Sequence, residues 1–165
     1  MGDPVIVRPA RAEDQPRILE IYNREVAFST ATYDTTPRSR EEQDAWLAHH
    51  DARHPVLVAV VGDRVGGWAS LSPWSDRAAY DSSAEVSVYV AEESRRRGIG
   101  RILLGALIDA GKLHGFHALL ARISADNEAS VRLHAALGFS TVGMLKEAGI
   151  KFGRLLDVAI MELVL

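Results

Sequence analysis

The hydrophobic positions of the chain fall into short apolar runs and into longer segments with helical spacing. Residues 5–7 (VIV) and 55–61 (PVLVAVV) are apolar runs rich in β-branched residues, which are typical of buried strands. The turn signal Gly62-Asp63 separates the second run from another that begins at Val65, so these two runs predict a hairpin. Residues 84–90 (AEVSVYV) alternate strictly, which predicts a strand with one polar face.

Four segments carry helical periodicity or the boundary signals of helices. Ser39 is followed three residues later by Glu42, a capping box that predicts the start of a helix. Gly138 stands where the end of a helix favours a left-handed residue. Residues 27–37 (AFSTATYDTTP) lack a helical period and predict a loop. The predicted helices cover residues 13–25, 39–53, 99–113 and 127–137.

Three further strands, near residues 118–123, 140–146 and 155–165, complete a predicted order of βααβββαβαββ. Hairpins beside crossover helices predict an α/β protein whose mixed, mostly antiparallel central sheet is flanked by helices. With 165 residues and no linker or internal repeat, the chain is predicted to be a single domain over residues 1–165.

Composition narrows the classes of function. The chain is 47% hydrophobic and 25% charged, which excludes wholesale disorder. It has 19 Lys and Arg against 22 Asp and Glu, a net charge of −3, so we expect no nucleic-acid partner. The absence of cysteine excludes disulfides, Cys-ligated metals and a cysteine nucleophile. Five histidines show no metal-ligand spacing, and no metal is expected: His49, His50, His54, His114 and His117.

Targeting signals are also missing from the sequence. Residues 1–4 lack the basic and apolar segments of a signal peptide. No apolar run approaches the roughly 18 residues that a membrane span needs. We therefore expect a cytoplasmic protein without a membrane partner.

The most informative segment is residues 95–100 (RRRGIG), which lies between a predicted strand and a predicted helix. Glycines let a ligand approach the backbone, and the unpaired N–H groups at a helix N-terminus favour an anion such as a diphosphate. A solvated charge run followed by a plain turn explains the same six residues equally well. A dinucleotide fingerprint needs a third glycine where Leu103 stands, and the turn does not supply a P-loop.

Two motifs carry a resemblance to a known superfamily. Residues 95–100 have the pattern R-x-x-G-x-G, and residues 127–139 have N-x-x-S near their start and L-G-F at their end. Both patterns resemble the acyl-CoA motifs of the GNAT superfamily of N-acetyltransferases. The closer resemblance is to the phosphinothricin and methionine sulfoximine or sulfone N-acetyltransferase family. It is carried by residues 73–80, 85–90, 130–139, 143–145 and 151–157.

This resemblance implies a GNAT fold whose sheet is splayed open at the site for acetyl-CoA, the cosubstrate. The backbone of residues 88–90 would pair with the pantetheine arm, and the N–H groups of residues 96–101 would hold the diphosphate. The implied acetyl-CoA contacts are Val88, Tyr89, Val90, Arg95, Arg96, Arg97, Gly98, Ile99, Gly100, Arg101, Asn127 and Ser130.

Two residues are the implied catalytic groups. Glu85 lies on the polar face of its strand, where a carboxylate can remove the ammonium proton of the acceptor, although it can equally pair with an arginine. His134 lies about two helical turns from Asn127 on the same face, where an imidazole can serve as acid or base. A histidine buried in the core is the alternative for His134.

The same resemblance implies an anionic amino-acid analogue as acceptor and a homodimer. A cationic fork suits the acceptor's carboxylate. The candidate acceptor residues are Trp74, Arg77, Tyr80, Phe28, Thr32, Tyr33 and Lys151. Two alternatives stay open: a GNAT enzyme for another small amine or a protein N-terminus, and a non-catalytic module that binds acyl-CoA.

Overall fold

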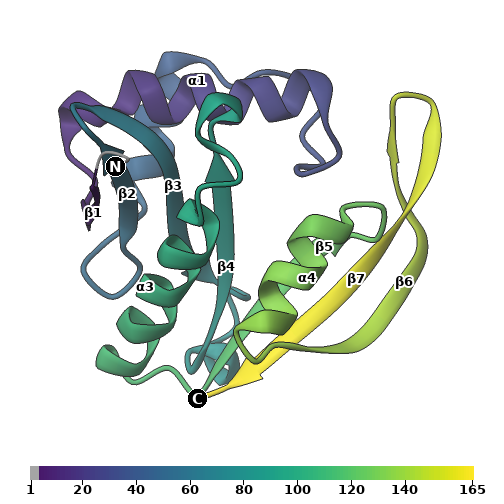
Figure 1. Cartoon of the computed structure of the whole chain (residues 1–165). Helices are drawn as coiled ribbons and strands as arrows, with labels where there is room; N and C mark the ends of the chain where they lie inside the picture. Colours follow the sequence, from purple (N-terminus) through teal and green to yellow (C-terminus); the bar gives the residue numbers. More distant parts are fainter. Residues whose placement is uncertain (1–3) are drawn as a thin grey trace.

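The computed structural model describes residues 4–165, and these form seven strands and four α-helices around one sheet (Figure 1). The strands are β1 (Val5–Pro9), β2 (Val56–Val61), β3 (Arg64–Pro73), β4 (Ser83–Val90), β5 (Ala118–Ser124), β6 (Ser140–Lys151) and β7 (Arg154–Val164). The helices are α1 (Gln15–Phe28), α2 (Arg40–Ala48), α3 (Ile99–Leu113) and α4 (Glu128–Ala136), joined by three short 3₁₀ turns. The predicted element order is confirmed.

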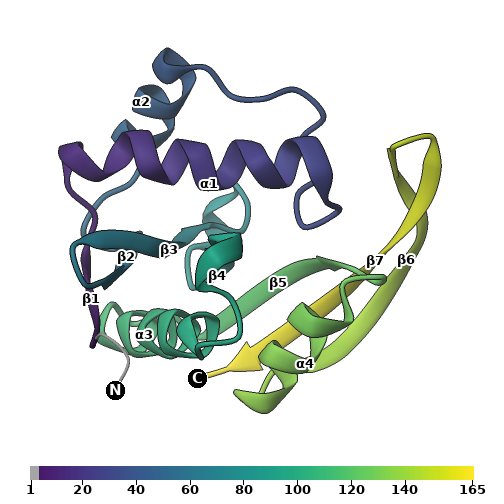
Figure 2. The same cartoon turned by 45° about the horizontal axis from the view of Figure 1, so that its top comes forward.

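The sheet has the strand order β1-β2-β3-β4-β5-β7-β6. Its neighbouring strands pair antiparallel except β4 and β5, which are parallel. α1 and α2 lie on one side of the sheet, and α3 and α4 on the other (Figure 2). The predicted mixed α/β class is therefore confirmed. No helix of the described residues is long and apolar enough to cross a membrane. Residues 1–3, on which part of the signal-peptide expectation rests, lie outside the description.

Three predicted boundaries were wrong, each for a local reason. α1 runs past residue 25 because the first extended residue is Ser29, whose N–H donates to Glu25. α2 ends before residue 53, at a point where the Nδ1 atoms of His49 and His50 bond to two of its last carbonyls. β6 continues past a bulge at Glu147, which has a φ of 53°.

The sheet opens between β4 and β5. The two strands pair only from Ser83 to Glu85, and beyond this point β4 has no strand partner on that side within residues 4–165. The N–H of Ala91 donates to the carbonyl of Gly66 on β3. Successive residues of an antiparallel strand point their backbone groups to opposite sides, so the N–H and C=O groups of Val88 and Val90 face away from β3, into the gap. The predicted splay is confirmed, and it leaves the N–H and C=O groups of Val88 at its edge without a strand partner within residues 4–165.

Two apolar cores pack against this opened sheet. On one face, α3 buries Leu103, Leu104 and Leu107 completely against β3 and β4. On the other face, Trp68 of β3 packs with Tyr22 of α1 in a second cluster. Both faces of β3 are therefore covered, whereas the face of β4 that carries Glu85 and Ser87 is open to the gap.

Candidate active site

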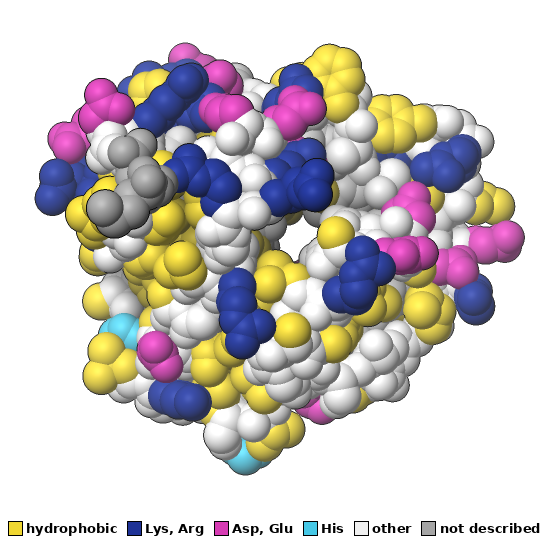
Figure 3. Space-filling view, in the orientation of Figure 1, with side chains coloured by type: hydrophobic (Ala, Val, Ile, Leu, Met, Phe, Trp, Pro, Cys, Tyr) yellow, Lys and Arg dark blue, Asp and Glu magenta, His cyan; other side chains and the backbone are white. Residues whose placement is uncertain are grey.

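Two adjoining cavities occupy the gap between β4 and β5. One has a volume of about 700 Å³ and runs along β4 to the start of α3. The other, of about 500 Å³, lies between β4, β5 and residues 30–34. A space-filling view shows an opening near the middle of the molecule, with Lys and Arg side chains close to its rim (Figure 3). Both cavities are lined by Thr30, Ala31, Val88, Tyr89, Asn127 and Ser130.

The larger cavity ends on the turn before α3. Gly98 precedes the helix with a φ of +76°, and a Cβ built on it would meet nothing within 4 Å. This open, left-handed position lets a bulky anion reach the first N–H groups of α3, which a helix leaves unpaired. Gly100 packs closely, because a Cβ there would lie 3.2 Å from Leu133. The turn therefore fits the diphosphate of acetyl-CoA.

Most of the predicted acetyl-CoA residues meet in this cavity. Its lining includes Val88, Tyr89, Val90, Arg95, Arg96, Gly98, Ile99, Gly100, Arg101, Asn127 and Ser130. Arg97 is outside the lining that the described chain provides. Arg95 pairs with Glu25 and donates to the carbonyl of Val90, so it braces the turn against α1. The role of each residue toward acetyl-CoA stays a prediction.

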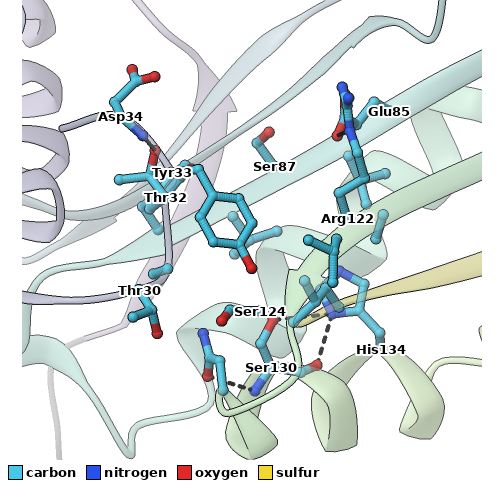
Figure 4. Close-up of a pocket in the computed structure, with 18 of the residues that line it drawn as sticks. Thr30, Thr32, Tyr33, Asp34, Glu85, Ser87, Arg122, Ser124, Ser130 and His134 are labelled. Carbon is cyan, nitrogen blue, oxygen red and sulfur yellow. Dashed lines mark hydrogen bonds and ion pairs between the residues drawn. The ribbon is translucent and has the colours of Figure 1, made fainter. Parts of the chain in front are cut away.

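Glu85 lines the smaller cavity together with Arg122 of β5, and the two side chains lie next to each other in Figure 4. Arg122 donates to Glu85 through Nε at 2.7 Å and through Nη2 at 2.5 Å. Its guanidinium also stacks over the ring of Trp74. Ser87 and Ser124 follow on the same faces of the two strands, so the cavity floor is polar.

His134 reaches the same cavity from α4 and is 4% exposed. Its Nδ1 lies 2.8 Å from the carbonyl oxygen of Ser130, which can only accept, so Nδ1 carries the proton. Burial lowers the pKa of His134, against the smaller opposing effect of that hydrogen bond. The neutral ring therefore presents an unprotonated Nε2 with no bonded partner in residues 4–165. This group can accept a proton.

Residues 30–34 close the cavity opposite Glu85 (Figure 4). The hydroxyl of Tyr33 donates to the carbonyl of Asp157 on β7. The hydroxyl of Tyr22 bonds to Thr32 and Asp34, and the pKa of Tyr22 rises to about 12, chiefly through burial. Helix α1 and strand β7 thus fix the segment from both sides.

Several predicted acceptor residues lie elsewhere. Lys151 is buried behind residues 30–34 rather than in the cavity, with Nζ bonded to the carbonyls of Glu25 and Thr32. Phe28 is 75% exposed at the end of α1, with Arg24 over its ring. Arg77 and Tyr80 lie in the exposed loop before β4, outside the cavity lining within the described chain. Their contact with an acceptor stays a prediction.

The sequence reasoning missed Arg122 and Ser124. Both lie on β5 at alternate positions, facing away from the buried side chains of Ala121 and Ile123. The alternation of residues 118–123 is a usable signal, because a charged residue flanked by buried apolar ones marks a polar face. Across residues 4–165 no cluster of three or more His, Asp or Glu side chains could hold a metal ion.

Comparison with known proteins agrees with this geometry. A model of the acetyltransferase (GNAT) family matches residues 17–139. The phosphinothricin N-acetyltransferase of Streptomyces coelicolor is 41% identical over 94% of this chain and 93% of its own length. The L-methionine sulfoximine/L-methionine sulfone acetyltransferase of Pseudomonas aeruginosa is 38% identical over 95% of this chain and 92% of its own.

A solved structure also carries the cosubstrate. The phosphinothricin acetyltransferase of Sinorhizobium meliloti, in complex with acetyl-CoA, is 36% identical with a TM-score of 0.95, over 98% of this chain and 88% of that one. Because it covers 98% of this chain, the similarity includes the elements that line both cavities. The chain belongs to the GNAT acetyltransferase family.

Proposed function

We propose that the protein transfers the acetyl group of acetyl-CoA to the α-amine of a small amino-acid analogue of the phosphinothricin, L-methionine sulfoximine or methionine sulfone type. The observation that carries this proposal is the junction of the two cavities at Val88 and Tyr89. A thioester that lies along β4 would present its carbonyl carbon at this junction, next to an amine held beside Glu85. The names of relatives at about 40% identity support the class of acceptor.

The free backbone groups of β4 supply alignment and polarisation. The N–H of Val88 points into the gap, where it can donate to the acetyl oxygen as negative charge develops there. Alignment of two reactants alone can supply roughly 7–11 kcal/mol of the barrier reduction. Acetyl-CoA itself brings the activated acyl group: the C–N bond forms as the C–S bond breaks, and the leaving CoA thiolate takes up a proton. The chain therefore needs to place the amine, polarise the carbonyl and remove the proton of the amine.

Two groups of the smaller cavity can take the ammonium proton. Glu85 accepts two hydrogen bonds from Arg122, and its remaining lone pairs can accept from the ammonium or from a bridging water. His134 offers the unprotonated Nε2. Both routes act through groups that the fold fixes before the substrates bind, and the Glu85 and His134 variants described below separate them.

Release of free thiol from acetyl-CoA tests the proposal. The wild-type protein is mixed with L-methionine sulfoximine, L-methionine sulfone or phosphinothricin, and thiol formation is followed. We expect thiol release that depends on each acceptor and saturates with it. Acetyl-CoA binding measured by calorimetry, without thiol release from any acceptor, would instead identify a non-catalytic binding module.

A protein N-terminus is the second candidate acceptor. A Brucella melitensis structure described as a ribosomal-protein-alanine N-acetyltransferase is 40% identical to this chain, with a TM-score of 0.94. Peptides that begin with alanine therefore form a second arm of the thiol assay. Faster turnover of the peptides than of the free amino acids would favour this candidate.

A homodimer and a cytoplasmic location belong to the same proposal. The β6–β7 hairpin exposes a series of large apolar side chains, and such a surface is often an interaction surface. They are Val142, Met144, Leu145, Ile150, Phe152 and Leu155. Light scattering during gel filtration should give twice the chain mass of 18.0 kDa. A mass of one chain at working concentration would refute the dimer.

A further inference from the structure

Arg122 lies where β4 and β5 separate. Glu85 pairs with Leu120 at the last position that joins the two strands, and Arg122 is two residues further along the same face of β5. Its guanidinium is therefore diagonal to the carboxylate of Glu85. Arg122 and Glu85 are therefore the first ion pair inside the opening between the two strands.

The guanidinium of Arg122 is only partly used. Of its five N–H groups, Nε and one on Nη2 donate to Glu85. The other three have no partner among residues 4–165. Cζ lies 5.1 Å from the centre of the Trp74 ring, which supports one face of the group. The side chain is 52% exposed and lines the smaller cavity, so its free end, formed by Nη1 and Nη2, is open to a ligand.

We propose that the free end of Arg122 binds the α-carboxylate of the acceptor while Glu85 accepts from its α-ammonium. This inference rests on the proposed function and names the specificity-determining residue of the site. In an α-amino acid one carbon separates the ammonium from the carboxylate. Arg122 and Glu85 are in direct contact, so a cation and an anion lie side by side in the cavity, each next to the acceptor group of opposite charge. An end-on guanidinium matches a carboxylate with two parallel hydrogen bonds.

The arrangement also rejects other amines. The second ammonium group of a diamine would meet a guanidinium that is already fixed by Trp74 and Glu85. An acceptor without a carboxylate would leave the free N–H groups of Arg122 unpaired near the reacting amine. Both effects favour an α-amino acid with a free carboxylate.

The test compares an acid with its amide. Wild-type protein and Arg122→Gln are assayed with L-methionine sulfone and with L-methionine sulfone α-carboxamide, which keeps the amine and loses the anion. We expect Arg122→Gln to raise KM for the acid by about 10–100-fold, the value of a charged hydrogen-bond pair. KM for the carboxamide should change by less than about 3-fold. Arg122→Lys should restore part of the affinity for the acid, since it keeps the charge and loses the fork.

Equal losses for the acid and the carboxamide would overturn the proposal, because they would mean that Arg122 acts only by holding Glu85. Wild-type protein that does not distinguish the acid from the carboxamide would overturn it as well. Wild-type protein inactive on every amino-acid acceptor would refute the proposed function itself, and the carboxylate site with it. Calorimetry with acetyl-CoA should give unchanged affinity for each variant. Arg40→Gln, which removes an exposed pair with Asp44 on α2, should behave as wild type.

Discussion

Lys151 at the end of β6 donates from Nζ to the carbonyl oxygen of Thr32 at 2.7 Å. The same ammonium lies 3.3 Å from the carbonyl of Glu25 at the end of α1. Burial lowers the pKa of this lysine, and the nearby Asp34 and Glu25 only partly oppose that effect. A buried charge is costly, so its presence here indicates that it holds residues 30–34 against the hairpin.

Replacing Lys151 with Met should loosen that segment. The carbonyl of Thr32 loses a donor inside the protein, which costs about 1–3 kcal/mol of unfolding free energy. KM for the acceptor should rise more than KM for acetyl-CoA, because the segment lines the smaller cavity. Urea unfolding and initial rates measure the two effects. Unchanged stability together with a raised acceptor KM would instead support the predicted direct contact of Lys151 with the acceptor.

Glu85→Gln should lower kcat by about 10²–10⁴-fold, the usual contribution of a general base. Acetyl-CoA affinity should stay near that of wild type, because Glu85 lies outside the larger cavity. An unchanged kcat would contradict the assignment of Glu85 as base. His134→Gln is the partner experiment, and a loss of kcat in that variant alone would assign the proton to the histidine.

Gly98→Ala should weaken acetyl-CoA binding. A φ of +76° costs a residue with a Cβ roughly 1–2 kcal/mol, and the new methyl group would take up part of the open space at the start of α3, where we expect the diphosphate. We expect an increase in the Kd for acetyl-CoA of about tenfold or more, measured by calorimetry.

Gly105→Ala is the matched control for that change. Gly105 lies inside α3, and a Cβ there also meets nothing within 4 Å. Alanine in a helix interior should stabilise the protein by about 0.5–1 kcal/mol and leave the Kd unchanged. Equal effects of the two substitutions on acetyl-CoA binding would contradict a diphosphate site at Gly98.

Local sequence signals predicted most of the fold because they act over a few residues. The helix from Ile99 to Leu113 has its predicted bounds, since Gly98 precedes it and His114 with Gly115 ends it. The capping box of Ser39 and Glu42 is present with both hydrogen bonds. The bulge at Glu147 escaped prediction, because its N–H bonds to the side chain of Asp157 on the neighbouring strand, a contact that the local pattern does not show.

The site was predictable in part for the same reason. Gly98 and Asn127 stand in local motifs, so the turn and the helix cap that they form could be read from the sequence. The pairing of Glu85 with Arg122 joins residues 37 positions apart and follows from the register of β4 against β5. The anchoring of Thr32 by Lys151 spans 119 positions. Contacts of this range depend on the assembled sheet.

The stability of the protein should decline as pH falls below about 6.5, the ordinary pKa of histidine, in part because of His134. Burial lowers its pKa in the folded state, so over that window the unfolded chain binds a proton that the native state does not. In His134→Gln this contribution is absent, while that of His50, whose pKa burial also lowers, remains. Urea unfolding at about pH 7.5 and about pH 5.5 should therefore show a larger loss of unfolding free energy in wild type than in His134→Gln. Equal losses of unfolding free energy in the two proteins would mean that His134 binds the same number of protons in the folded and unfolded states. That result would contradict a neutral, buried imidazole in the cavity.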